Sequence, residues 1–317
     1  MQLFTPVALP PAPFRLTPIS RVLTLGSCFA QHIGQHIAAA LPDGHALVNP
    51  FGPLYAPQVI AHHLRLLLDT APLPDATYFE GVEGMWHNRW FSTHVSSAEF
   101  ATCRRLTTDA LSAARDLLRR ADVLVLTLGT DRCYRLPDGR LVANCHKQPA
   151  ATFTEHAADV ETLTSDLRRA LDSLRALRPE LQVVWTVSPY RYAKYGLHAS
   201  QLAKARLLLA VDALCATDER SVYFPAYELL LDELRDYRYY ARDLLHPSDT
   251  AVELIGERFA DWCFAPTLHT FARERARLLR AHQHRPLHPE SDAHRAFRAK
   301  LQREAELFRA KWGISPF

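Results

Sequence analysis

Short stretches in which nearly every residue is apolar alternate along this chain with segments of helical spacing. The clearest are DVLVLTLGT at residues 122–130 and LQVVWTVSP at residues 181–189, and VLTLG at residues 22–26 begins the series. A strand that is apolar on both faces has to be covered on both faces, and the intervening helical segments supply that cover. The pattern predicts a three-layer α/β/α fold with a mostly parallel central sheet.

The same pattern divides the chain into three parts. Residues 1–20 hold five prolines and are expected to form an extended arm. Residues 21–265 carry the predicted α/β domain, and residues 266–317 form a charged, His-rich helical extension. Strands are predicted at 21–25, 45–49, 122–130, 181–189 and 221–227, and helices at 28–40, 57–70, 97–121, 152–179, 200–216, 226–234 and 248–262. Residues 75–100 indicate an insertion or a pair of short strands.

The composition is that of an ordinary globular protein of 317 residues, with 48% hydrophobic residues and a formal net charge of +3. This charge is too small to indicate a nucleic-acid partner. No run of apolar residues approaches the roughly 18 that a spanning helix needs, and the N-terminus lacks a leader pattern, so a cytoplasmic protein is expected. Six dispersed cysteines without a CxxC pair predict reduced, buried thiols.

Small and polar residues follow each predicted strand. Gly26-Ser27-Cys28 follows the first strand, NPFG at residues 49–52 the second, Gly129-Thr130-Asp131 the third, and SPYRY at residues 188–192 the fourth. Ligands of open parallel sheets bind beyond the carboxyl ends of the strands. These segments are therefore predicted to meet at one site.

A carboxylate stands three residues before an imidazole in the segment Asp243-Leu244-Leu245-His246. Such spacing on a loop can bring the carboxylate to one ring nitrogen and leave the other facing outward, which fixes the tautomer that a general base needs. Paired with Ser27, it would supply the base and the orienting group that a serine nucleophile requires.

Seven ordered motifs resemble those of the GSCFA family, which is itself similar to the SGNH or GDSL hydrolases. They are LGSCFA, NPFGPLY, LTLGT, VANCHKQP, TVSPYRY, YFPAYE and DELRDYRYYARDLLHPS, within about residues 20–265. The resemblance implies an SGNH-hydrolase-like fold with Ser27 as nucleophile, Asp243 and His246 completing the triad, and the backbone amide of Gly52 in the oxyanion hole.

The third motif departs from the SGNH pattern. Where those enzymes have G-x-N, this chain has Gly129-Thr130-Asp131, and a carboxylate would repel a developing oxyanion. We therefore expect Asn144, and after it Thr130, to supply the side-chain donor of the oxyanion hole.

Ser27 and Cys28 are the two candidate nucleophiles, and a purely structural site is the third alternative. Both would begin a helix, whose dipole favours developing negative charge. The first residue past a strand-to-helix glycine usually points up from the sheet, and the next one packs inward. This favours Ser27 and predicts that Cys28 is a small core residue.

Further residues are candidates for substrate binding. Trp90 and His94 could wall an acyl or alcohol pocket, or belong to a structural aromatic cluster. His146 and Arg191 could bind an anion, and Asn49 stands in the second motif. His32 and His36 lack the glutamate of an H-E-x-x-H motif, so no metal is predicted, and the proposed chemistry requires no cofactor.

These observations predict a serine-dependent acyl-ester hydrolase that works through an acyl-enzyme intermediate. An acyltransferase using the same triad is the first alternative, and a non-catalytic binding protein on the same scaffold is the second. The expected partner is a small-molecule, lipid or glycan ester. The sequence predicts no nucleic acid partner and no transmembrane segment, and it leaves the oligomeric state open.

Overall fold

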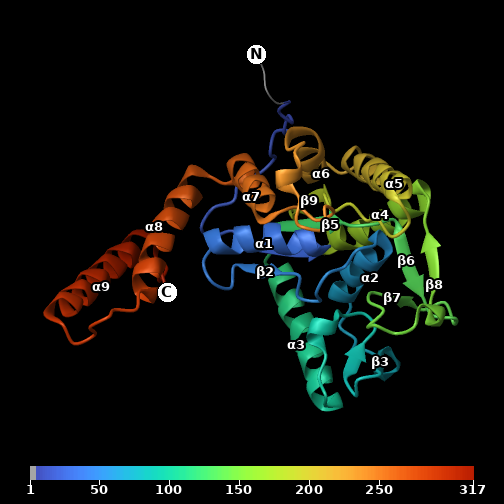
Figure 1. Cartoon of the computed structure of the whole chain (residues 1–317), viewed down its shortest axis with the longest axis horizontal. Coiled ribbons are helices and arrows are strands. Elements are labelled where there is room, and N and C mark those ends of the chain that lie inside the picture. The colour runs from blue at the N-terminus through green and yellow to red at the C-terminus, as the bar shows by residue number, and fades with distance from the viewer. Residues whose placement is uncertain (1–4) are drawn as a thin grey trace.

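A five-stranded parallel sheet forms the centre of the computed structural model, which describes residues 5–317 (Figure 1). The strand order is β10-β9-β5-β1-β2, and every neighbouring pair is parallel. Its strands are β1 (Val22–Gly26), β2 (Ala46–Val48), β5 (Val123–Leu128), β9 (Gln182–Val187) and β10 (Ser221–Tyr223). This confirms the parallel sheet that the apolar segments predict.

Helices cover both faces of the sheet, with α2 to α5 on one face and α1 and α7 on the other. The helices are α1 (Cys28–Ala40), α2 (Pro57–Leu68), α3 (Phe100–Leu118), α4 (Val160–Leu177), α5 (Leu197–Cys215), α6 (Ala226–Glu228), α7 (Asp249–Cys263), α8 (Pro266–Gln283) and α9 (Asp292–Trp312). Residue 226 begins a short α-turn that continues as a π-turn, Leu229–Glu233, within the segment predicted as a helix. The three-layer α/β/α arrangement of the prediction is confirmed.

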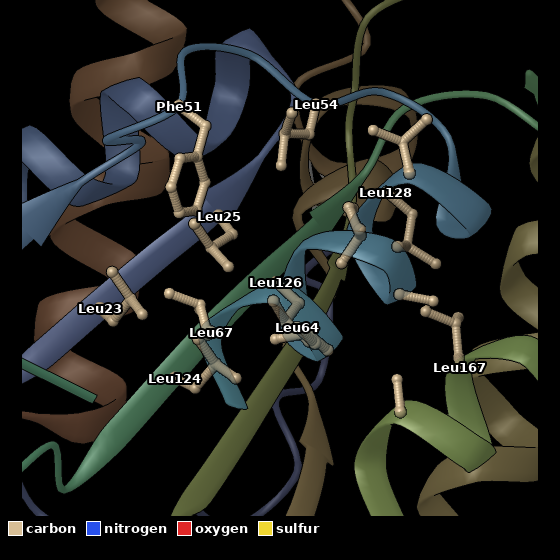
Figure 2. Packing of buried hydrophobic residues seen from close by; sticks show 14 of the residues in the cluster. Leu23, Leu25, Phe51, Leu54, Leu64, Leu67, Leu124, Leu126, Leu128 and Leu167 are labelled. Atoms are coloured by element: carbon tan, nitrogen blue, oxygen red, sulfur yellow. The ribbon is translucent and has the colours of Figure 1, made fainter. Parts of the chain in front are cut away.

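Alternation along the strands assigns each side chain to one of two cores. Leu23, Leu124 and Leu126 face the layer formed by α2 to α5, which Figure 2 shows from close by. The neighbouring strand residues point the other way: Val22 and Val125 pack with α1 and α7 on the opposite face. Because successive strand residues point to opposite faces, an unbroken apolar run fills both cores at once.

The turn from β1 into α1 fits only glycine at its centre. Gly26 has φ +144°, and a Cβ atom there would lie 2.3 Å from the backbone oxygen of Thr127 on β5. The absence of a side chain lets β1 end tightly against β5. Ser27 then caps α1, so the helix starts directly at the carboxyl edge of the sheet.

Two small antiparallel sheets flank the carboxyl edge. The pair β3 (Tyr78–Glu80) and β4 (Trp86–Asn88) confirms the predicted short strands. A second sheet, β7 (Leu141–Val142), β6 (Arg132–Arg135) and β8 (Thr154–Ala157), is not predicted, and the expectation of helix from residue 152 is wrong there. Helix α4 begins only after its cap Asp159. Strands this short show no readable period, and their partners lie up to 25 residues away.

The two ends of the chain pack on the α7 side. In the arm, Leu16 pairs with Phe264, and Pro10 accepts a hydrogen bond from the Trp262 side chain. Helices α8 and α9 form an antiparallel pair that projects from the body (Figure 1). Arg275 anchors this pair through an ion pair with Asp43. The domain boundaries themselves stay a prediction.

Candidate active site

A cavity of about 340 Å³ opens at the carboxyl ends of β1, β5 and β9. The first turn of α1, the segments that follow β5 and β9, the second small sheet and the loop before α7 contribute its walls. Its lining includes Ser27, Cys28, Tyr55, Gly129, Thr130, Tyr134, Asn144, Ser188, Tyr190, Tyr192 and His246. The predicted meeting of the strand-end segments therefore occurs for the first, third and fourth of them.

Asp243 and His246 form the hydrogen bond that their spacing makes possible. The Nδ1 atom of His246 lies 2.5 Å from Oδ2 of Asp243, and the backbone N–H groups of Leu245 and His246 donate to Oδ1 at 3.0 Å. These bonds, that from the His246 amide foremost, hold the pKa of Asp243 well below its usual range, so the carboxylate is ionised. Tyr190 stacks on the imidazole, with 4.1 Å between ring centres. The Nε2 atom of His246 is the ring nitrogen left for the cavity.

Ser27 and Cys28 both line the cavity, and Cys28 differs from its expected orientation. The side chain of Ser27 is only 1% exposed, and its Oγ accepts the N–H of Phe29 at 3.3 Å because Ser27 is the N-cap of α1. Cys28 is half-buried and lines the cavity. The expectation that Cys28 packs inward is thus wrong, since a capping side chain turns toward the helix amides and the following residue is the one left at the surface.

The candidate oxyanion donors are placed very differently. Asn144 lines the cavity and accepts the N–H of His146 on Oδ1 at 2.8 Å, which leaves its Nδ2 as a donor. Thr130 also lines the cavity, but its hydroxyl is 3.5 Å from a carboxylate oxygen of Asp131. Gly52 does not fit the prediction, because its amide already donates to the oxygen of Asn49 at 2.8 Å and it lies in a neighbouring groove.

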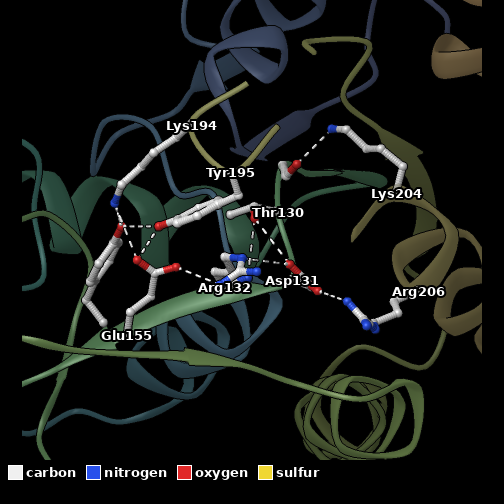
Figure 3. A network of polar contacts seen from close by, with 10 residues as sticks. Thr130, Asp131, Arg132, Glu155, Lys194, Tyr195, Lys204 and Arg206 are labelled. Carbon is white, nitrogen blue, oxygen red and sulfur yellow. Dashed lines mark hydrogen bonds and ion pairs between the residues drawn. The ribbon is translucent and has the colours of Figure 1, made fainter. Parts of the chain in front are cut away.

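A charged network holds the cavity wall behind Thr130 (Figure 3). Asp131 is fully buried and pairs with Arg206 at 2.6 Å, consistent with its exclusion as an oxyanion donor. Glu155 on β8 bonds to Arg132 on β6 at 3.0 Å and to Lys194 at 3.3 Å. The network ties the second small sheet to the segment after β9, so both walls of the cavity are fixed relative to each other.

Lys204 is a buried residue at this site that sequence reasoning missed. Its ammonium donates to the backbone oxygens of Gly129 and Ser188 at 2.7 Å each, and the side chain is 1% exposed (Figure 3). Burial lowers the pKa of Lys204 to about 7. The available signal was a lysine on the apolar face of α5, in the segment AKARLLLAV.

The predicted substrate-binding residues lie outside the cavity. Trp90 packs edge to face on His62, in the structural aromatic cluster that was its alternative. His94 and Asn49 line the neighbouring groove, which also touches Cys28. Asn49 donates to the backbone oxygens of Gly26 and Ser27. Arg191 borders a different hollow on the far side of the His246 loop, where its amide donates to Leu245 at 3.0 Å.

His146 is buried and not placed to bind an anion. Its Nε2 lies 3.1 Å from the backbone oxygen of Asn88, and its ring packs 4.6 Å from that of His87. Burial, followed by the neighbouring His87, lowers the pKa of His146 to about 4. The imidazole is therefore neutral at physiological pH, and a neutral ring gives no electrostatic attraction to an anion.

Acidification is expected to destabilise the protein partly through His146. An unfolded imidazole titrates near ~6.5, so the unfolded chain binds a proton before the folded one does, and the free energy of unfolding falls between about pH 6.5 and 4 by up to about 1.4 kcal/mol per pH unit. We expect His146→Asn to lose less stability over this interval in urea titrations. Asparagine tolerates the left-handed backbone of residue 146, where φ is 48°. Equal losses in both proteins would contradict this assignment.

The family comparison matches most of the chain. The model of the GSCFA family matches residues 21–259, and that of the GSCFA domain protein C-terminal domain matches residues 276–313. The chain belongs to the GSCFA family. No curated protein matches. Within residues 5–317 no helix is long and apolar enough to cross a membrane, and no group of three metal-binding side chains occurs.

Several solved structures are distantly similar. A mutant acetyl esterase with an acetate ion has 10% identity and a TM-score of 0.39, over 80% of this chain and 99% of that one. A family 3 carbohydrate esterase from Talaromyces cellulolyticus has 9% identity and a TM-score of 0.37, over 80% and 99%. An acetyl xylan esterase from the rumen bacterium Butyrivibrio proteoclasticus has 13% identity and a TM-score of 0.35, over 77% and 63%.

Proposed function

We propose that this GSCFA protein is an ester hydrolase that works through an acyl-enzyme intermediate, with His246 as general base and Asp243 as its orienting carboxylate. The observation that supports this proposal is the 2.5 Å contact between Asp243 and Nδ1 of His246, on the wall of a cavity that also holds the first turn of α1. A carboxylate on Nδ1 favours the tautomer whose Nε2 accepts a proton.

The proposed reaction has two halves. A nucleophile on the first turn of α1 attacks the ester carbonyl, His246 accepts its proton, and the protonated imidazole returns that proton to the leaving alcohol. Water then releases the acid by the same route. The sequence-based hypothesis assigns the attack to Ser27, and the thiol of Cys28 is the rival. Asn144 and the backbone amide of Cys28 would stabilise the oxyanion.

The lining of the cavity supports an uncharged acyl group on the substrate. Val59, Val142 and Ala143 supply apolar surface, and Tyr134 and Tyr192 add phenol rings whose hydroxyls can bond to a polar alcohol portion. Esters of small molecules, lipids or glycans fit this description. An acyltransferase would use the same residues, with an alcohol or amine in place of water in the second half.

Intact-protein mass spectrometry tests the proposal directly. The protein is incubated with p-nitrophenyl esters of acetate, butyrate and octanoate, and the mass added to the chain identifies the acyl group that the cavity accepts. We expect an adduct in the parent protein and none in His246→Ala. An adduct that persists until an alcohol is added would identify a transferase, and release of nitrophenol without any covalent adduct in rapid-quench samples would contradict the acyl-enzyme route.

A further inference from the structure

The side chain of Ser27 is buried at the cap of α1, on the wall of the cavity. Its Oγ accepts a hydrogen bond from the amide of Phe29, and the residue is 1% exposed. The backbone is equally engaged, since its N–H donates to Thr127 at 3.0 Å and its oxygen accepts from Ala30 at 2.9 Å and from Asn49 at 3.2 Å. This side chain presents almost no surface to the cavity.

The thiol of Cys28 stands one residue further on, where the helix leaves a side chain free. Cys28 is the first residue of α1 and is half-buried. It lines both the cavity that contains His246 and the adjoining groove. The groove wall also carries Asn49, which is 5% exposed and whose Oδ1 has no hydrogen-bond partner among residues 5–317. An unpaired buried oxygen beside the thiol points to a donor group of a ligand.

A buried lysine side chain ends against the segments that follow β5 and β9. The Lys204 ammonium has three N–H groups, of which the oxygens of Gly129 and Ser188 accept two, and it forms no ion pair with a carboxylate within the described chain. Burial lowers the pKa of Lys204 to about 7, and a thiolate at Cys28 would oppose that shift. Burial raises the pKa of Cys28, and the Phe29 amide and Lys204 act against it.

We propose that Sγ of Cys28, and not Oγ of Ser27, attacks the acyl carbon. This inference rests on the proposed function. The thiol proton passes to Nε2 of His246, the Sγ–C bond forms, the ester C–O bond breaks, and the proton goes to the leaving alkoxide. Water then cleaves the thioester to acid and thiol. Ser27 holds the turn that presents the thiol to the cavity.

Hydroxylamine distinguishes the two nucleophiles, because at neutral pH it cleaves thioesters and leaves ordinary oxyesters intact. After incubation with p-nitrophenyl acetate, we expect the parent protein to carry an acetyl group on the peptide that contains Cys28, removable by hydroxylamine. Cys28→Ala should lose the adduct and at least about 10³-fold in kcat. Cys28→Ser, which keeps the size of the side chain, should carry an adduct that resists hydroxylamine.

Two further variants complete the test. Ser27→Ala should lower the thermal unfolding midpoint through loss of the cap and reduce kcat far less than Cys28→Ala does. Cys215→Ala, which removes another half-buried thiol at the end of α5, should keep the adduct. An adduct that resists hydroxylamine, maps to Ser27 and survives in Cys28→Ala would overturn the assignment of Cys28 while upholding the proposed function. Absence of any adduct in the parent protein would overturn both.

Discussion

Replacement of His246 by alanine is expected to lower kcat by about 10⁴-fold on any ester that the protein turns over. The imidazole is the cavity-lining group that is paired with a carboxylate at Nδ1 and free to accept a proton at Nε2. Without it, the nucleophile on α1 keeps its proton and the leaving alkoxide receives none. Steady-state kinetics on purified His246→Ala, with circular dichroism to verify folding, measures the loss.

Non-additivity separates a catalytic unit from independent contributions. The double variant Cys28→Ala/His246→Ala should be little slower than either single variant, because the two groups act in one proton transfer. Losses that multiply in the double variant would mean that His246 does not serve this nucleophile.

Replacement of Asp243 by asparagine should reduce kcat while leaving the free energy of unfolding nearly unchanged, since Asp243 is exposed and acts through the tautomer of His246.

Replacement of Asn144 by alanine is expected to lower kcat by about 10²–10³-fold with little change in KM, equivalent to about 2.7–4 kcal/mol of transition-state stabilisation. The reason is the free Nδ2 of Asn144 on the cavity wall, whose partner oxygen carries negative charge only in the transition state. Separate measurement of kcat and KM tests this selectivity.

Asn144→Asp is the matched control for a structural role. An aspartate keeps the acceptor that receives the amide of His146 at 2.8 Å, but it replaces the donor with a charged oxygen that would repel an oxyanion. Kinetic loss in Asn144→Asp with an unchanged unfolding midpoint would support the oxyanion role. Full activity in Asn144→Asp, combined with a kinetic loss in Thr130→Val, would transfer that role to Thr130.

The central sheet could be predicted from the sequence, because its signal is local. Runs such as VLVLTL must be covered on both faces. The amphipathic spacing of the intervening segments indicates which of their residues pack against the sheet. Gly26 followed by a capping serine likewise fixes where β1 ends and α1 begins. The contact between Asp243 and His246 spans three residues, so its geometry was also within reach of the sequence.

The side chains that reach the cavity could not be predicted from the sequence, because their directions depend on how the elements pack. Ser27 and Cys28 are adjacent in sequence, and the choice between them depends on the direction that the capped turn gives each side chain. Lys204 became part of the site because α5 packs beneath the ends of β5 and β9. The sheet of β6, β7 and β8 depends on pairings between separate short segments, and no single segment of the sequence encodes a non-local pairing.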